Sequence, residues 1–131
     1  MKVDRQLVFN KFGGKCAYSG TDLKDDWQID HIVPKSLKLT PEYHGISCHN
    51  DIKNLVPVQR IINHYKRSLS LIDFKNWYLG QLHIRLSKLP KKTNSHTTIK
   101  RKTYLLEVAS YFDITESKPF NGKFYFETLE K

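Results

Sequence analysis

Four polar residues in the first half of the chain are of types that can together hold a metal ion and activate water. Asp30 and His31 are adjacent, and Asn54 is followed by Asn63 nine residues later. Carboxylate and carboxamide oxygens are ligands that hard divalent cations prefer. A neutral imidazole at pH 7 can accept a proton from water. The set predicts metal-assisted hydrolysis, with Asp30 and Asn63 as metal ligands and His31 as general base.

The surroundings of Asn63 indicate the kind of substrate. An apolar stripe at helical spacing precedes and follows it, formed by Val58, Ile61, Ile62 and Tyr65. A helix with this stripe directed to the core places Arg60, Asn63 and Arg67 on another face. Together with Lys66, the two arginines supply positive charge where a phosphate group would bind. His64 becomes the rival metal ligand if the helix is rotated.

The neighbouring pair Asp30 and His31 lies near the end of an apolar segment that Pro34 closes. Strict alternation along a strand sends the two side chains to opposite faces. Both can serve one site only if the chain bends there, which Pro34 and the segment after it permit.

Local patterns predict a single α+β domain, since the chain has 131 residues and its composition suits a compact core. No internal repeat is present. The first predicted elements are a helix capped by Asp4 and stopped by Gly13-Gly14, strands over 15–18 and 27–33, and a long loop over 35–53. Three helices follow: one with Pro57 in its first turn, one capped by Ser70 and stopped by Pro90, and one over about 98–112. The last predicted element is a strand over 123–127 after the turn Asn121-Gly122. The aromatic side chains, Trp27 and Trp77 included, are expected in the core.

The positive charge of the chain is concentrated in one stretch. Residues 60–102 contain 11 Lys or Arg and one acid, Asp73, although the net charge of the whole chain is +9. Such a stretch predicts a polyanionic partner, DNA before RNA, and we expect it to supply non-specific affinity for the phosphate backbone. The chain shows neither an apolar run that would span a bilayer nor a signal peptide, and it has two cysteines. These features predict a cytoplasmic protein without a membrane partner.

Three segments resemble the HNH nuclease family, whose core is called the ββα-metal fold. They are Phe12-Gly13-Gly14-Lys15-Cys16-Ala17-Tyr18-Ser19-Gly20, Asp30-His31-Ile32-Val33-Pro34-Lys35-Ser36, and Asn54-Leu55-Val56-Pro57 through Asn63 and Lys66. The resemblance covers about residues 3–68. It implies a ββα-metal core with an N-terminal helix, followed by a helical extension over about 69–131.

The resemblance also implies roles for four residues. Asp30 and Asn63 would be ligands of one Mg²⁺ or Mn²⁺ ion, and His31 would be the base that activates water. Asn54 would tie the loop between strand and helix. Arg60, Lys66 and Arg67 remain the candidate nucleic-acid contacts from the charge argument.

The chain departs from the family at the positions of a structural zinc. Many members hold their strands with two Cys-x-x-Cys pairs, whereas here the corresponding positions are Cys16, Ser19, Gln59 and Ile62. We therefore expect no structural zinc. A different cluster formed by Cys16, His44, Cys48 and His49 is the alternative, and otherwise the helices after residue 70 complete the core.

The resemblance thus implies a DNA endonuclease of the small type found in bacteria and phages. A non-catalytic nucleic-acid-binding module of the same fold is the alternative. A membrane-surface protein is disfavoured, because no basic helix has an exposed apolar face. The recognised sequence, nicking or double-strand cutting, and the oligomeric state are left open.

Overall fold

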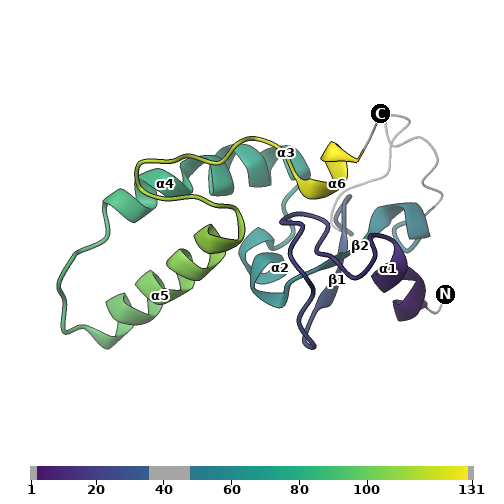
Figure 1. The fold of residues 1–131 in the computed structure, drawn as a ribbon, viewed down its shortest axis with the longest axis horizontal. Coiled ribbons are helices and arrows are strands. Elements are labelled where there is room, and N and C mark those ends of the chain that lie inside the picture. The colour runs from purple at the N-terminus through teal and green to yellow at the C-terminus, as the bar shows by residue number, and fades with distance from the viewer. Residues whose placement is uncertain (1–2, 36–47, 130–131) are drawn as a thin grey trace. The chain divides into compact units, whose positions relative to one another are not determined.

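The computed structural model describes residues 3–35 and 48–129, and it is a mixed α+β structure with a two-stranded antiparallel sheet and several helices (Figure 1). The chain forms two compact units. The first comprises Met1–Ile72 and Phe124–Lys131, and the second comprises Asp73–Lys123. The residues expected to form the nuclease core, about 3–68, all belong to the first unit, which also includes the end of the chain.

The first unit begins with helix α1 (Arg5–Asn10). The Asp4 carboxylate accepts hydrogen bonds from the backbone N–H groups of Gln6 and Leu7, which have no partner inside the helix. The predicted capped helix is therefore confirmed. Val8 is its buried residue.

Strands β1 (Gln28–His31) and β2 (Leu55–Val58) pair antiparallel, with Asp30 opposite Val56 and His31 opposite Leu55. β1 confirms the strand predicted within 27–33. A short 3-10 helix, η1 (Ile52–Asn54), leads directly into β2. The remainder of the predicted loop over 35–53 lies largely in residues 36–47, outside the described residues.

The prediction that Pro57 begins a helix is wrong, because Pro57 lies in β2 and helix α2 spans Arg60–Lys66. The Pro57 carbonyl accepts a hydrogen bond from Ala17 N. Pro57 therefore turns its backbone polar groups away from β1, and its missing N–H removes no bond between the strands.

The predicted strand over 15–18 is also wrong. Lys15 makes one isolated bridge to Asp22, and between them the chain makes a tight turn in which Gly20 N donates to the Cys16 carbonyl. Gly20 has a φ of +73°, and a Cβ there would lie 2.7 Å from the Tyr125 ring. Only glycine accommodates both conditions at this position.

The C-terminal segment is a short helix, α6 (Tyr125–Thr128), and not the predicted strand. The Glu127 side chain accepts a hydrogen bond from Phe124 N, and this contact favours a helical turn. The N–H groups of Tyr125 and Phe126 donate to the carbonyls of Tyr18 and Ala17. Phe124 is fully buried with its ring 4.7 Å from that of Tyr18. Phe124 is thus part of the first unit's core.

The second unit is helical. After the short turn α3 (Leu71–Asp73) come the π-helix η2 (Phe74–Leu79), α4 (Gly80–Ser87) and α5 (His96–Tyr111). These elements confirm the helices predicted after Ser70 and near residues 98–112. The wide π turn changes the buried face, so that Leu79 is buried and Tyr78 is partly exposed. Gly80 permits this turn, because a Cβ there would lie 2.5 Å from the Lys75 carbonyl oxygen.

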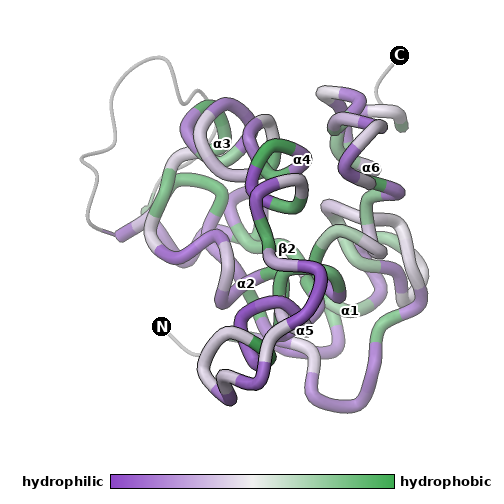
Figure 2. Tube along the Cα trace, turned by 90° about the vertical axis from the view of Figure 1, so that its left-hand side faces the viewer, coloured by the Kyte–Doolittle hydropathy of each residue, from purple (hydrophilic) through white to green (hydrophobic). Residues whose placement is uncertain are grey.

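Each unit has its own set of buried apolar side chains. In the first they come from α1, the 15–22 turn, Val33, β2, α2 and Phe124, and in the second from η2, α4, α5 and Ile114. Figure 2 shows apolar and polar residues alternating along the helices, as expected for helices with one buried face. Trp77 differs from the prediction, because 64% of its surface is exposed. In the described ranges, no helix has the length and apolar character needed to cross a membrane.

Candidate functional site

The candidate site lies where the end of β1 meets α2. The side chains of Asp30 and His31 have different surroundings, as expected for neighbouring residues of a strand. Asp30 is buried and bonds to Tyr18, whereas His31 is half-buried and bonds to Asn50. Lys66 is a partner of both residues: its Nζ atom lies near the Asp30 carboxylate and donates to the His31 backbone carbonyl at 3.4 Å.

Asp30 is the centre of a buried polar cluster. Its Oδ2 atom accepts a hydrogen bond from the Tyr18 hydroxyl at 2.5 Å and lies 3.0 Å from Lys66 Nζ. Burial, with a smaller contribution from the Asp30 charge, raises the pKa of the Tyr18 phenol well above its ordinary value. The hydroxyl therefore stays protonated and donates to the carboxylate.

Lys66 does not lie on the surface where the charge argument expected it. Its side chain has no exposed area, and its ammonium group forms an ion pair with Asp30. A charge in this position neutralises a carboxylate inside the protein and is not offered to a phosphate outside it. Arg60 and Arg67, by contrast, are exposed, and Arg60 lies 4.0 Å from Asp26.

Asn63 lies one helical turn before Lys66. It contacts Gln28, which precedes Asp30 by two residues in β1. Its Nδ2 group donates to Gln28 Oε1 at 2.8 Å, while Lys66 pairs with Asp30. Helix α2 therefore runs beside β1 with two polar contacts in register. Asn63 and Asp30 belong to neighbouring contacts and are not direct partners of each other.

The donor chemistry of this pair fits a hard divalent cation. Asp30 Oδ1 and Asn63 Oδ1 accept no hydrogen bond from the part of the chain that the structure describes. Both are oxygen donors of the kind that Mg²⁺ and Mn²⁺ prefer. The Lys66 ammonium is the competing cation, since it already pairs with the same carboxylate.

His31 is held by a residue that the sequence did not single out. Its Nε2 atom lies 2.8 Å from Asn50 Oδ1. A carboxamide oxygen can only accept, so Nε2 carries the proton and the lone pair of the neutral ring is on Nδ1. Among the described residues, Nδ1 has no hydrogen-bond partner. Asn50 lies in a segment without periodicity, so no sequence signal marked it.

Asn54 is fully buried and links the segments that flank the sheet. Its Oδ1 accepts a hydrogen bond from Val33 N at 2.7 Å, and its Nδ2 donates to the carbonyls of Val33 and His49. Its own carbonyl accepts from Ile32 N. These bonds fix the chain directly after His31 to the chain directly before β2.

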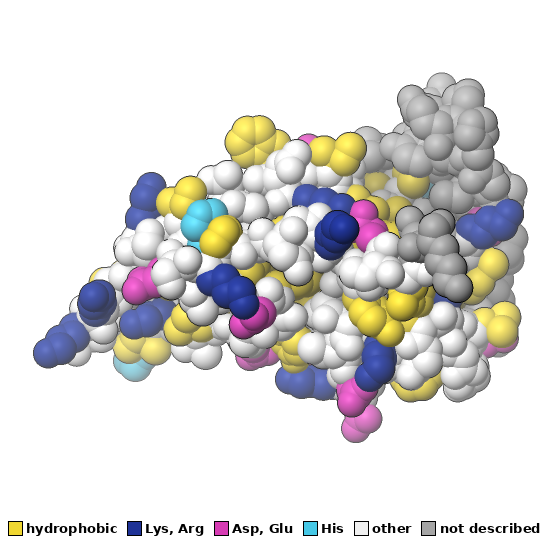
Figure 3. Space-filling view, turned by 45° about the horizontal axis from the view of Figure 1, so that its top comes forward, with side chains coloured by type: hydrophobic (Ala, Val, Ile, Leu, Met, Phe, Trp, Pro, Cys, Tyr) yellow, Lys and Arg dark blue, Asp and Glu magenta, His cyan; other side chains and the backbone are white. Residues whose placement is uncertain are grey.

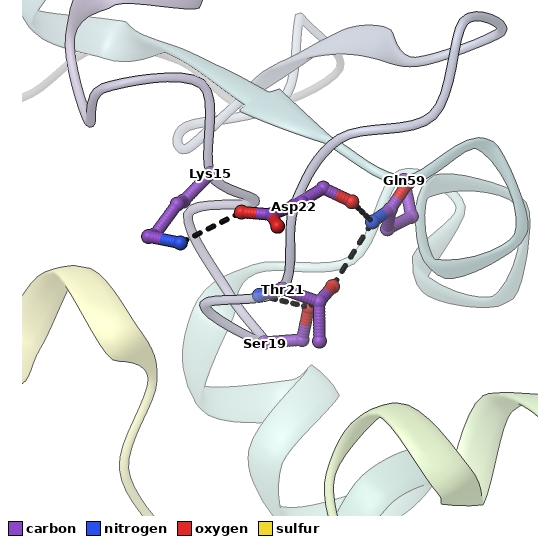
Figure 4. Close-up of polar contacts among 5 residues, drawn as sticks. All are labelled: Lys15, Ser19, Thr21, Asp22 and Gln59. Carbon is purple, nitrogen blue, oxygen red and sulfur yellow. Dashed lines mark hydrogen bonds and ion pairs between the residues drawn. The ribbon is translucent and has the colours of Figure 1, made fainter.

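A hydrogen-bond network contains Ser19 and Gln59, which stand at two positions where the resemblance to HNH nucleases would place zinc ligands (Figure 4). Gln59 Nε2 donates to Thr21 Oγ1 and to the Asp22 carbonyl, while its Oε1 accepts from Lys24 N. Ser19 shares a hydrogen bond with Thr21. Cys16 and Ile62, at the other two positions, are fully buried. A side-chain amide thus joins the turn after Gly14 to the start of α2.

We expect this network to contribute to stability. Replacing Gln59 by alanine should lower the free energy of unfolding by about 1–3 kcal/mol, because the buried Gln59 side chain makes three hydrogen bonds that alanine cannot replace. Urea unfolding monitored by circular dichroism measures the change. Gln6→Ala is the matched control, because Gln6 is exposed and its side chain, within the described residues, bonds to Asn10 alone; it should change stability by less than about 0.5 kcal/mol.

The same measurement after exhaustive dialysis against EDTA separates this network from a zinc site. The unfolding curve of the parent should stay unchanged, and elemental analysis should find no retained zinc. One equivalent of zinc would contradict this expectation and support the alternative cluster of Cys16, Cys48, His49 and His44. Of these, His44 lies outside the described residues.

Across residues 3–35 and 48–129, no three His, Cys, Asp or Glu side chains are grouped in a way that could hold a metal ion. The candidate pair contains one residue of these types, Asp30, together with an amide. Comparison with protein-family models, with curated proteins and with solved structures gave no match for this chain.

Proposed function

We propose that the first unit is a metal-dependent endonuclease of the HNH type, built on a ββα-metal core, that hydrolyses phosphodiester bonds of DNA. One arrangement carries the proposal. β1 ends on Asp30 and His31, Asn54 fixes the chain that follows them, and α2 places Asn63 against β1. The backbone positions of these residues, which are distant in sequence, thus lie near one end of the strand pair, while the side chains of Asp30, His31 and Asn63 contact different partners.

His31 is the proposed general base. Because Asn50 binds Nε2–H, Nδ1 is the atom that takes a proton from the attacking water. Asn50 thus holds the ring in one tautomer, as the third group of a catalytic set commonly does. Arg60 and Arg67, both exposed on or directly after α2, contact the phosphate backbone on either side of the scissile bond.

Asp30 and Asn63 would hold one Mg²⁺ or Mn²⁺ ion. Such an ion supplies positive charge that stabilises the phosphorane-like transition state and the leaving oxygen. Lys66 and Tyr18 hold the Asp30 carboxylate in place from the interior of the unit.

A second candidate function is a nucleic-acid-binding module that does not cut. The Asp30–Lys66 ion pair favours it, because a carboxylate that is already neutralised has a structural role without any metal. The exposed arginines would serve binding in either case.

Supercoiled plasmid distinguishes the two. The purified protein should convert it to nicked or linear DNA with Mg²⁺ or Mn²⁺ and leave it intact in EDTA. A structured RNA of similar length, tested in parallel, identifies the preferred nucleic acid. A protein that binds the plasmid but cuts it with neither metal is the non-catalytic module.

A further inference from the structure

The second unit contains a long stretch of chain with positive charge only. Residues 74–106 include eight Lys or Arg and no Asp or Glu. The stretch covers η2, α4, the connection between α4 and α5, and the first two-thirds of α5. Charge alone does not separate cations that serve the fold from those that can serve a partner.

Several of these cations have structural contacts within the unit. Arg85 donates to the carbonyls of Tyr78 and Trp77 and lies 5.4 Å from the centre of the Tyr78 ring. Lys102 Nζ donates to the Pro90 carbonyl at 3.3 Å, which brings the second turn of α5 beside the connection. Lys75 is only partly exposed.

The remaining five cations gather at one end of the α4–α5 hairpin. We call this group the hairpin tip, and it consists of Lys88, Lys91, Lys92, Lys100 and Arg101. Lys88 ends α4, and Arg101 is five residues into α5, about 8 Å along the helix axis from its start. All five are exposed, and within the described part of the chain none has an ion pair or a side-chain hydrogen bond. Lys and Arg side chains gather at the left-hand end of Figure 3, which corresponds to this connection in Figure 1.

The surroundings of the hairpin tip suit a phosphate backbone. Five exposed like charges repel one another, and a polyanion relieves that repulsion and releases its own condensed counterions. The segment between the helices is polar, with exposed Asn94, Ser95 and His96 as further hydrogen-bond donors. A membrane-surface helix needs a continuous apolar face, whereas here Ile99 is the one large apolar residue of 88–101 that is highly exposed.

We propose that the hairpin tip is a binding surface for the backbone of duplex DNA, carried by a different unit from the candidate catalytic residues. The identity of the polyanion rests on the proposed function, and the surface itself rests on charge and exposure. The hairpin tip contributes affinity and residence on DNA and takes no part in hydrolysis. Its contacts are with phosphates, so it does not select a sequence.

The test uses the full chain and a fluorescent 30-base-pair duplex in EDTA, where no metal-dependent cleavage interferes. Dissociation constants of the parent and of a variant with all five tip residues changed to Gln are measured from 50 to 200 mM KCl. Each phosphate contact contributes about 0.9 to the slope of log K against log salt, so five contacts contribute about 4.5. Over this fourfold range, the parent should lose on the order of 10²–10³-fold more affinity than the variant.

A second variant controls for net charge. It changes five exposed lysines elsewhere to Gln, namely Lys24, Lys35, Lys53, Lys118 and Lys123. The proposal expects a clearly smaller loss of slope in this control than in the tip variant, with both circular dichroism spectra unchanged. Equal slopes in the two variants would overturn the proposal.

Two further outcomes are informative. Anionic vesicles containing phosphatidylserine are tested with the same proteins; vesicle binding that depends on the tip while DNA binding does not would also overturn it. A protein that binds DNA through the tip but never cuts plasmid leaves this proposal standing and removes the catalytic one. A protein that cuts plasmid, but whose salt dependence of DNA binding is the same with and without the tip residues, supports the catalytic proposal and overturns this one.

Discussion

Replacing His31 by alanine is expected to slow DNA cleavage by about 10²–10⁴-fold while leaving DNA affinity unchanged, because the general base is lost and no metal ligand is. The ring bonds to Asn50 and not to the buried cluster around Asp30, so the change should leave the first unit folded. Single-turnover cleavage of plasmid in Mg²⁺, with duplex affinity measured separately in Ca²⁺ or EDTA, gives the two quantities.

His64→Ala is the matched control, because His64 is an exposed histidine on α2 in the same unit. It should cut at the parent rate. If instead His31→Ala cuts normally and His64→Ala does not, the roles of the two histidines are exchanged.

Two other substitutions separate the base from the residues around it. Asn50→Leu should leave the ring in place without its acceptor, so the neutral imidazole populates both tautomers and the rate falls less than with His31→Ala. Nitrogen NMR of the ring reports the tautomer directly, and Asn50→Asp, which keeps an acceptor oxygen, should restore the Nε2–H form. Asn63→Ala should weaken metal binding, and higher Mn²⁺ should recover part of the rate by mass action. Asp30→Ala should weaken metal binding as well, but it should also destabilise the first unit, because Lys66 would stay buried without its counterion.

Local signals predicted the elements whose causes are local. Asp4 caps α1 as predicted, whereas α5 begins at His96, two residues before the predicted start, because Ser95 caps it by accepting from Thr98 N. Pro57 was misassigned because its role depends on Ala17, forty residues earlier in the chain. The prediction of a C-terminal strand was wrong for a similar reason, because the backbone N–H groups of Tyr125 and Phe126 donate to the distant 17–18 segment.

The residues of the candidate site were identifiable by type, but their partners were not. Sequence patterns selected Asp30, His31, Asn54 and Asn63, whereas Tyr18, Asn50 and Gln28 act through contacts that span 12 to 35 residues. The burial of Lys66, by contrast, could have been predicted from its position in the sequence. Lys66 follows Ile62 by four positions, so helical geometry places it on the buried face, where a lysine requires a buried carboxylate.

The ion pair that this position implies leads to the second large effect. Lys66→Met should lower the free energy of unfolding by about 3–5 kcal/mol, because Asp30 would stay buried without its counterion. Tyr18→Phe is the graded control. It keeps the ring and removes one hydrogen bond to the same oxygen, so about 1–3 kcal/mol is expected. Urea unfolding followed by Trp27 fluorescence in a Trp77→Phe background reports on the first unit alone, since Trp77 belongs to the second and is exposed.

The double variant Lys66→Met with Asp30→Asn decides whether charge is the cause. Removing both charges should recover most of the lost stability, because no buried charge is left uncompensated. A double variant as unstable as Lys66→Met would show that the loss comes from packing around the lysine stem.

Stabilisation by Mn²⁺ tests metal binding at Asp30 without measuring cleavage. If Asp30 also binds a divalent ion, then Mn²⁺ should stabilise Lys66→Met more than the parent, because the ion replaces the missing positive charge without a competing ammonium. Equal stabilisation of the two proteins would mean that Lys66 does not compete for the ion, and no stabilisation of either would remove Asp30 from the metal site.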